Sequence, residues 1–295
     1  MKLGLFSISY AGLWGQAAID LCQFIHKARL LGYDTVMLAG KRPQLSVLDA
    51  NASQVDALRN ALSEAGVTCS VVAAYNDLGA KSGAEVPLVE MQILYVESLC
   101  RIASKLGANV VRLFTSYLGD GVFSQSSWQR AVVTFREIAD RAAAHGVTVA
   151  IQNHHDLAVD TLSLLEMLDE IGRPNCKLGF DAWSPALRGE DLYQSAKLAA
   201  PHTAITTNAD YIRLPQFCYR PELINYERVF PDLVRAVPFG AGCIDYGAFF
   251  KGLKEGGFDG IASYEMCSPI RGGGSLENLD EYARSYISWM RSNVS

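Results

Sequence analysis

The sequence predicts an α/β protein and, within that class, a (β/α)8 TIM barrel. Two observations predict this fold. Short apolar runs rich in β-branched residues recur along the whole chain, and segments of helical periodicity separate them. Strands that are apolar on both faces and separated by helices pair in parallel through right-handed crossovers. Eight such units close into a barrel, so we expect a single domain over residues 1–295.

Eight segments have the composition of strands. They are KLGLFSIS from Lys2, DTVMLAG from Asp34, VTCSVVAAY from Val67, NVVRLFTS from Asn109, VTVAIQN from Val147, CKLGFDA from Cys176, TAITTNA from Thr203 and GIASYEM from Gly260. Helices are expected between them, for example over 17–32, 53–66, 89–107 and 126–146, each ending in a glycine that suits a C-cap. The alternative is an open doubly wound sheet, but the first turn, SISYAGLWGQ, lacks G-x-G-x-x-G.

The loop after the seventh strand is extended. The last two strands start 57 residues apart, at Thr203 and Gly260, whereas the other starts are roughly 27 to 40 residues apart. The insertion is rich in Tyr, Arg and Pro. Because it leaves the face where barrel enzymes place their sites, we expect it to wall one side of a pocket. A loop that makes oligomer contacts is the alternative.

Composition excludes several classes of protein. The net charge is -5 and the 26 basic residues form no runs, which argues against a nucleic-acid partner. No apolar run approaches the length of a membrane span, and the N-terminus lacks a small-residue cleavage site. Seven cysteines without C-x-x-C spacing are expected to be reduced and mostly buried. For Cys267, just after a strand, contact with a ligand stays open beside a packing role. We expect a globular cytoplasmic enzyme.

Polar residues collect at the ends of the predicted strands. They are Tyr75, Asn76 and Asp77 after the third strand, Arg112 and Thr115 in the fourth, Gln152 to Asp156 after the fifth, Asp181 and Trp183 after the sixth, Thr207, Asn208 and Asp210 after the seventh, and Glu265 after the eighth. In a barrel these ends converge on one mouth. We expect Tyr75, Asn76 and Arg112 to bind substrate there.

Asp181 and Glu265 each follow an apolar strand that gains nothing from a carboxylate unless the group meets a cation or hydrogen-bond donors. Two such groups on one mouth indicate a metal. Oxygen ligands favour Mg²⁺ or Mn²⁺, and an imidazole ligand favours Mn²⁺, Co²⁺ or Zn²⁺. The alternative for each carboxylate is a helix cap or an ion pair with an arginine such as Arg112.

Of five histidines, only His154 and His155 fall at the carboxyl end of a strand. His26 and His145 lie in or at the end of helices, and His202 precedes the seventh strand. A hydrogen-bonding role in the loop and a role in ligation or acid-base chemistry both stay open for the first two.

The Asn-His motif at Asn153 and His154, Asp181 after the sixth strand, and GAGCIDYGAFFKGLKEGGFDGIASYE ending at Glu265 resemble the xylose isomerase-like TIM barrels. This superfamily contains sugar isomerases, sugar and keto-sugar epimerases, inosose dehydratases and endonuclease IV-type enzymes. The resemblance spans all eight units. It implies one divalent cation held by Glu, Asp, His and Glu from the last four strands.

Carried onto this chain, the pattern is matched at Asp181 and Glu265 only. Gln152 stands where the first Glu is expected, and Thr207 or Asn208, depending on register, where the His is expected. The metal ligands implied are therefore Asp181, Glu265, Gln152 and Asn208. An amide accepts no proton at neutral pH, so Gln152 is expected to be a neutral ligand or a substrate hydrogen-bonder and not a base.

The resemblance implies an enzyme that acts on a sugar, keto-sugar or cyclitol by metal-assisted enolisation, as an isomerase, epimerase or lyase. Glu265 with His154 or His155 is expected to move protons, and epimerisation on two faces would need His154 as second base. Trp183 is expected to stack on the sugar. Arg271, before Gly272 to Gly274, is a candidate for binding the substrate through a phosphate.

Two alternatives stay open. A non-catalytic barrel that binds a carbohydrate, or a subunit of a complex, would account for the altered residues at 152 and 207 to 208. An endonuclease IV-like phosphodiesterase would need a zinc cluster, for which the histidines are few and poorly placed. The sequence leaves homo-oligomer formation open.

Overall fold

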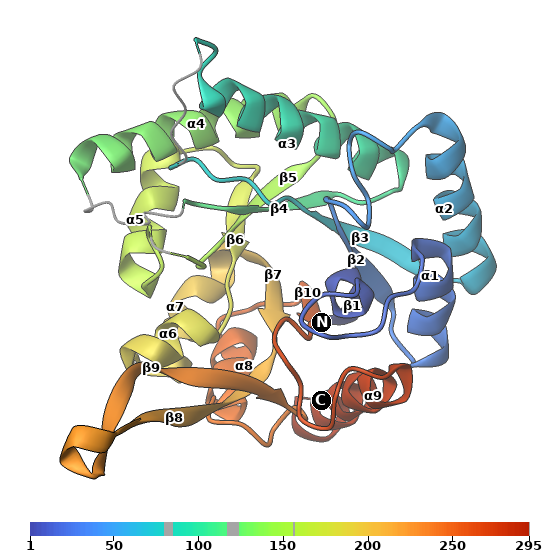
Figure 1. The fold of residues 1–295 in the computed structure, drawn as a ribbon. Helices are drawn as coiled ribbons and strands as arrows, with labels where there is room; N and C mark the ends of the chain where they lie inside the picture. Colours follow the sequence, from blue (N-terminus) through green and yellow to red (C-terminus); the bar gives the residue numbers. More distant parts are fainter. Residues whose placement is uncertain (80–84, 117–123, 156, 295) are drawn as a thin grey trace.

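The computed structural model describes residues 1–79, 85–116, 124–155 and 157–294, which form a closed barrel of eight parallel strands surrounded by helices (Figure 1). The order around the barrel is β1, β10, β7, β6, β5, β4, β3, β2. Each barrel strand pairs in parallel with both neighbours, which confirms the predicted fold class. Asp156, expected at the mouth, lies outside the described residues.

The barrel strands span Lys2–Phe6 (β1), Thr35–Ala39 (β2), Thr68–Ala73 (β3), Val110–Phe114 (β4), Thr148–Gln152 (β5), Cys176–Gly179 (β6), Thr203–Asn208 (β7) and Ile261–Tyr264 (β10). The helices span Leu21–Leu30 (α1), Ala52–Ala65 (α2), Leu88–Lys105 (α3), Gln125–Ala143 (α4), Thr161–Ile171 (α5), Trp183–Arg188 (α6), Leu192–Ala199 (α7), Tyr246–Glu255 (α8) and Leu276–Asn293 (α9). Short 3-10 turns lie at Ser7–Tyr10 (η1), Ala200–His202 (η2) and Pro221–Leu223 (η3).

Local sequence sets the ends of the helices. Side chains accept hydrogen bonds from the first-turn N–H groups of seven helices, and these caps are Asp20, Asn51, Ser124, Asp160, Asp191, Asp245 and Ser275. The glycines expected after four helices, Gly32, Gly66, Gly107 and Gly146, all have positive φ, where a side chain would be strained. The helices therefore begin and end close to where the sequence predicts.

Strand alternation divides the core into two layers. Leu38, Val72 and Ile151 face outward and pack against the helices. Met37 and Val110 face inward and fill the barrel interior. The inward positions nearest the strand ends carry polar groups, so alternation decides which polar side chains reach the mouth.

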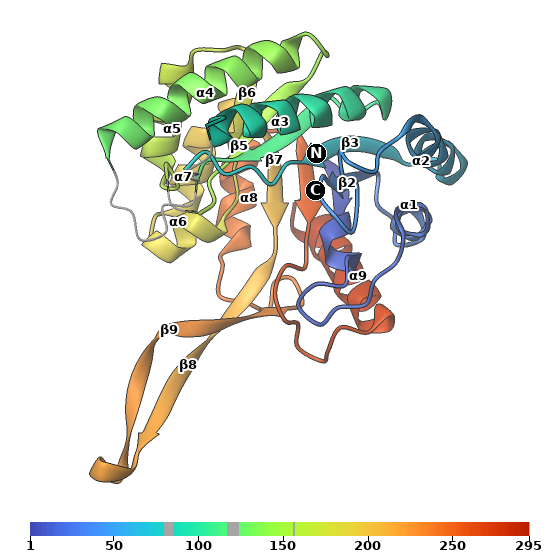
Figure 2. The ribbon, with the colours of Figure 1, turned by 45° about the horizontal axis from the view of Figure 1, so that its top comes forward.

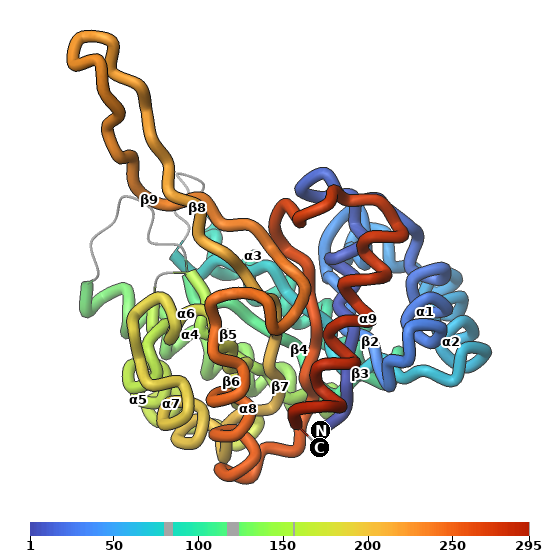
Figure 3. The backbone as a smooth tube through the Cα atoms, turned by 90° about the horizontal axis from the view of Figure 1, so that it is seen from below, coloured from blue at the N-terminus to red at the C-terminus, as the bar shows by residue number. Residues whose placement is uncertain are grey.

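The extended loop predicted after the seventh strand is an antiparallel hairpin of Asp210–Arg220 (β8) and Asn225–Val237 (β9). It leaves the mouth side and projects well beyond the barrel, with η3 at its tip (Figures 2 and 3). Tyr211 and Val237 at its base are buried, whereas the outer half is exposed. Its regular strands were not evident from the sequence.

Two further expectations can be compared with the structure. All seven cysteines are free thiols, but only Cys69, Cys100 and Cys176 are buried, so the expectation that most of them are buried was wrong. Within the described ranges, no helix is long and apolar enough to cross a membrane.

Candidate active site

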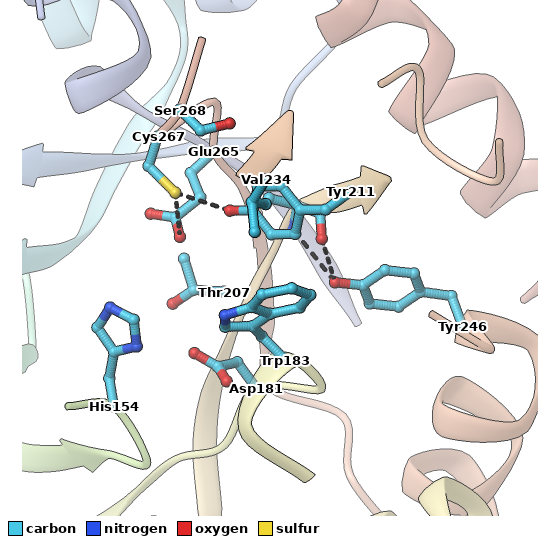
Figure 4. Close-up of a pocket in the computed structure, with 11 residues that line it drawn as sticks. His154, Asp181, Trp183, Thr207, Tyr211, Val234, Tyr246, Glu265, Cys267 and Ser268 are labelled. Carbon is cyan, nitrogen blue, oxygen red and sulfur yellow. Dashed lines mark hydrogen bonds between the residues drawn. The ribbon is translucent and has the colours of Figure 1, made fainter. Parts of the chain in front are cut away.

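Two neighbouring cavities lie at the mouth of the barrel. The first, about 220 Å³, is lined by Asp181, Thr207, Glu265 and residues around them (Figure 4). We call it the acidic lobe. The second, about 200 Å³, is lined by Lys41, Arg112 and their neighbours, and we call it the cationic lobe. Three residues line both cavities, namely His154, Glu265 and Cys267, so the lobes adjoin.

Asp181 is placed by its neighbours on β5. Asn153 accepts a hydrogen bond from the Asp181 N–H at 2.8 Å and donates one to the Asp181 carbonyl at 2.9 Å. The Gln152 amide nitrogen donates to Oδ2 of Asp181 at 2.6 Å, whereas Oδ1 is buried without a hydrogen-bond partner. Burial, with the nearby Glu265 charge, raises the pKa of Asp181 to about 7. The group therefore exchanges a proton near neutral pH and offers one oxygen to a ligand.

Glu265 follows β10 and points into the same space as Asp181, with Thr207 between them (Figure 4). Burial raises the pKa of Glu265, and the Arg112 charge opposes that rise. The Cys267 thiol donates to Oε1 at 3.4 Å, and its sulfur lies 2.8 Å from the Tyr211 hydroxyl. Among the described residues neither carboxylate forms an ion pair with an arginine or lysine, so the ion-pair alternative is not met. The helix-cap alternative keeps some support at Asp181, because the Ser184 N–H in the first turn of α6 opposes the rise of its pKa.

Both histidines after β5 reach the mouth. His154 lines both lobes and His155 lines the cationic lobe. Burial and the Arg112 charge lower the pKa of His155 to about 4. Its imidazole is therefore neutral at pH 7, and its ring packs edge-on against Phe114 at 4.4 Å between centroids. His154 is the better placed of the two, because it also faces the carboxylates (Figure 4).

Arg112 and Tyr75 lie together in the cationic lobe, as expected for substrate-binding candidates. Arg112 is only 2% exposed because its side chain, two residues after that of Val110, also points into the barrel. Its Nη1 donates to the Ala74 carbonyl at 2.8 Å, and its guanidinium lies 3.9 Å from the Phe114 ring centroid and 5.0 Å from that of Tyr75. Trp183 lines the acidic lobe at the start of α6, 4.8 Å from the Tyr211 ring.

Three expected site residues lie elsewhere. Asn76 clamps β3 to β4, donating to the Phe114 carbonyl at 2.6 Å and accepting from its N–H at 2.9 Å. The Asn208 side chain points outward from β7, and its amide donates to the Ser263 carbonyl and the Tyr286 hydroxyl. The Thr207 side chain points into the barrel and lines the acidic lobe in place of Asn208. Arg271 is exposed on the loop before α9 and lines neither lobe.

Sequence reasoning missed several lining residues. Lys41 follows β2 in a loop, and Tyr211 and Val234 come from the base of the hairpin. The hairpin thus walls one side of the acidic lobe. A rule that every strand end contributes to the mouth would have included Lys41, but no sequence signal distinguishes it from the other lysines.

The donor set does not fit the four-ligand metal site that the resemblance implies. Asp181 and Glu265 are carboxylates, but the other two positions carry the Gln152 amide and the Thr207 hydroxyl. The Gln152 group facing Asp181 is an N–H donor, which cannot ligate. No three His, Cys, Asp or Glu side chains of the described ranges are grouped to hold a metal ion. Metal dependence stays a prediction.

Residues 25–293 match the family model of the xylose isomerase-like TIM barrel. The chain belongs to this family, and the predicted resemblance is confirmed. The chain is 21% identical over 277 residues to the ketose 3-epimerase of Arthrobacter globiformis, an alignment that covers 91% of this chain and 84% of that protein.

Solved structures with the same fold include sugar epimerases. D-Psicose 3-epimerase from Clostridium cellulolyticum H10, with D-tagatose, gives a TM-score of 0.77 at 14% identity and covers 100% of both chains. The probable 3-DHS dehydratase of petrobactin synthesis from Bacillus anthracis gives 0.73 at 19% identity, over 99% of this chain and 99% of that one. At these identities the likeness establishes the fold, and the activity has to be argued from the site.

Proposed function

We propose that the protein is an isomerase or epimerase of a sugar or keto-sugar and acts by enolisation in the acidic lobe. The observation that carries this proposal is the pair of carboxylates, buried Asp181 and half-buried Glu265, which line one cavity without ion-pair partners among the described residues. Buried carboxylates with raised pKa values are suited to exchange protons at neutral pH. Relatives that act on ketoses support the substrate class.

The proposed chemistry divides the work between the two carboxylates. Ionised Glu265 removes the proton from the carbon next to the substrate carbonyl, the electron pair of that C–H bond forms a carbon–carbon double bond, and the π pair of the carbonyl group moves to its oxygen. Protonated Asp181 donates its proton to this oxygen, giving an enediol. Return of the proton from Glu265 to the former carbonyl carbon, with loss of the hydroxyl proton on the neighbouring carbon to ionised Asp181, completes an isomerisation. Return of a proton from protonated His154 to the original carbon on its opposite face, with the enediol proton going back to Asp181, completes an epimerisation.

Gln152 and Thr207 position these groups. The hydrogen bond from Gln152 fixes Oδ2 of Asp181 and leaves Oδ1 for the ligand. The Thr207 hydroxyl, buried without a hydrogen-bond partner between the carboxylates, suits a substrate hydroxyl. Both are buried polar atoms that a polyhydroxylated ligand would satisfy.

Solvent exchange tests the proposal. The protein is incubated in D2O with D-fructose, D-fructose 6-phosphate and D-fructuronate, and loss of the C–H signal next to the carbonyl is followed by proton NMR. We expect exchange with at least one of them, and a much slower exchange in Glu265→Gln. Binding without exchange would instead support the second candidate, a carbohydrate-binding barrel without activity, which the neutral groups at Gln152 and Thr207 favour.

We also propose that the chain forms a homodimer through the hairpin. On its outer half Phe217 pairs with Arg228 and Tyr219 with Tyr226, so these side chains share one face, and Arg228 lies 4.7 Å from the Phe230 ring centroid. Gln216 and the Arg220–Glu227 ion pair lie on the other face. The hairpin is therefore aromatic on one side and polar on the other, and a two-stranded hairpin alone is marginally stable.

The exposed apolar area of the hairpin and its neutral charge favour a second copy of this chain as the partner that covers its aromatic face. Phe217, Tyr219, Tyr226 and Phe230 are 58%, 49%, 65% and 72% exposed, and Leu223 and Ile224 at the tip are 69% and 83% exposed. At roughly 200 Å² for each large side chain, they expose on the order of 800 Å², one partner's share of a standard interface. Residues 210–237 hold four acidic and four basic residues, so this segment is neutral on a chain of net charge -5 and does not repel its copy.

Light scattering during gel filtration tests this interface. We expect the unchanged chain to be a dimer and the Phe217→Ser/Phe230→Ser variant to be a monomer with unchanged circular dichroism. Leu162→Ser, at a 70% exposed site on α5, is the control and should remain a dimer. A monomeric unchanged chain, or a variant that still dimerises, would contradict the interface.

A further inference from the structure

The cationic lobe holds two positive side chains that the proposed proton transfers do not use. Arg112 comes from β4 and Lys41 from the loop after β2. Lys41 Nζ lies 4.0 Å from the centroid of the Tyr75 ring, and the Arg112 guanidinium lies over the same ring. Both cations therefore contact the Tyr75 ring, and the positive charges of Lys41 and Arg112 lie close to each other.

Neither cation has an anionic partner in the described structure. No carboxylate oxygen lies within 4.0 Å of the Lys41 or Arg112 nitrogens, and the Nε of Arg112 is buried without a hydrogen-bond partner. Burial and the neighbouring Arg112 charge lower the pKa of Lys41. Buried charges without a counter-charge are costly, and a guanidinium cannot shed its proton.

We propose that the cationic lobe binds the anionic group of an acidic sugar, a carboxylate or a phosphate, while the carbonyl end of the same molecule lies in the acidic lobe. The lobes adjoin through His154, Glu265 and Cys267, so one ligand spans both. An ionised group beside Lys41 and Arg112 supplies the missing counter-charge through charge-assisted hydrogen bonds. This inference names the substrate class and rests on the proposed function.

The arrangement also fixes the orientation of the substrate. The Phe114 and Tyr75 rings, which stand at 72° to each other, both lie beside the Arg112 guanidinium, so an anion approaches it from a side that neither ring covers. Glu265 lines both lobes, but only in the cationic lobe do two positive side chains outweigh its charge, whereas an anionic group in the acidic lobe would lie beside Glu265 without them. The charge difference between the lobes therefore disfavours the reversed orientation, and it disfavours neutral sugars because they supply no charge for Lys41 and Arg112.

The Arg271 loop gives no competing anion site. Its glycines, Gly272 and Gly273, have positive φ, but Asn278 and Tyr282 fold back onto its carbonyl groups and Arg271 lines neither lobe. We therefore place the binding of an anionic substrate group, which the sequence suggested for Arg271, in the cationic lobe.

Calorimetric binding tests the inference without depending on turnover. The ligands are D-fructose, D-fructuronate and D-fructose 6-phosphate, which differ in one group. We expect at least one anionic ligand to bind about tenfold or more tightly than D-fructose, because charge-assisted hydrogen bonds are the stronger ones. The two anionic ligands distinguish a carboxylate site from a phosphate site.

Two matched variants complete the experiment. Lys41→Met removes the charge and keeps an apolar side chain, and it should reduce the preference for the anionic ligand to within about threefold. Lys177→Met changes a half-buried lysine at the start of β6, away from both lobes, and should keep the preference. Equal binding of the three ligands, no binding of any of them, or an unchanged preference in Lys41→Met would overturn the inference.

The result separates the inference from the proposed function. Preferential binding of an anionic sugar without solvent exchange would retain the anion site and refute the enolisation. Exchange without any preference for the anionic ligand would retain the enolisation and refute the anion site.

Discussion

The two lobes of the mouth hold buried charge in different ways. In the acidic lobe, Asp181 and Glu265 repel each other, and burial raises both pKa values, so a proton is retained near neutral pH. In the cationic lobe, Arg112 keeps its charge and is stabilised by the Phe114 and Tyr75 rings. The difference suggests a division of labour in which one lobe exchanges protons and the other holds a fixed charge against the ligand.

The largest effect is expected at Glu265. Glu265→Gln keeps the size of the side chain but removes the base, and general base catalysis is worth about 10²–10⁴-fold. We expect the exchange rate to fall by about 10³-fold with little change in ligand affinity. Progress curves with saturating ligand would measure this.

Cys267→Ser is the matched control for that variant. It keeps a hydrogen-bond donor beside Oε1 of Glu265 and should lose less than about tenfold in rate. Similar losses in both variants would mean that the position of the group and not its basicity matters.

The next effect is a pH-dependent change in stability at Asp181. Its pKa of about 7 in the folded protein exceeds the unfolded value, so folding binds a proton and stability falls as pH rises from about 4 to about 7. Asp181→Asn removes this loss and should raise the free energy of unfolding by about 2–4 kcal/mol at pH 8, with little change at pH 4. Urea unfolding at both pH values measures it.

Asp160→Asn serves as the control for the pH experiment. Asp160 caps α5 and its pKa is lowered, with hydrogen bonds from Ser163 opposing the effect of burial. This variant should give no stabilisation at pH 8. A gain there, or none in Asp181→Asn, would show that Asp181 is not a buried proton-binding group.

A smaller effect concerns the metal. If the neutral groups at Gln152 and Thr207 are what weakens a cation site, Gln152→Glu/Thr207→His should increase Mn²⁺ affinity by about tenfold or more, because affinity rises with ligand charge. Isothermal titration would measure it, with Asn208→His as the control because Asn208 faces the helices. Equal Mn²⁺ affinity in the double variant and the unchanged chain would show that residues 152 and 207 do not set metal binding.

Sequence patterns predicted the barrel because apolar strands and glycine-capped helices are local signals that agree along the chain. They also predicted the acidic lobe, because a carboxylate directly after an apolar strand is conspicuous, as at Asp181 and Glu265. Whether a side chain near the end of a strand points into the barrel or outward was harder to predict. A shift of one residue decides between Thr207 at the mouth and Asn208 against α9, and the sequence does not fix where β7 starts.

Two other features could not be predicted for physical reasons. Asparagines at strand ends look like ligand-binding residues, but Asn76 and Asn153 satisfy backbone groups of the neighbouring strand, a pairing that exists only in three dimensions. Lys41 joins Arg112 because β2 and β4 lie close in the barrel, although 71 residues separate them (112 minus 41). Local patterns carry no information about either contact.

A crystal structure of the Glu265→Gln variant with a bound keto-sugar tests the central claim most directly. We expect density for the ligand between Asp181 and residue 265, with the carbonyl oxygen within hydrogen-bond distance of Oδ1 of Asp181 and the C–H group facing residue 265. A ligand bound outside the mouth, or one that contacts only one of these two residues, would contradict it.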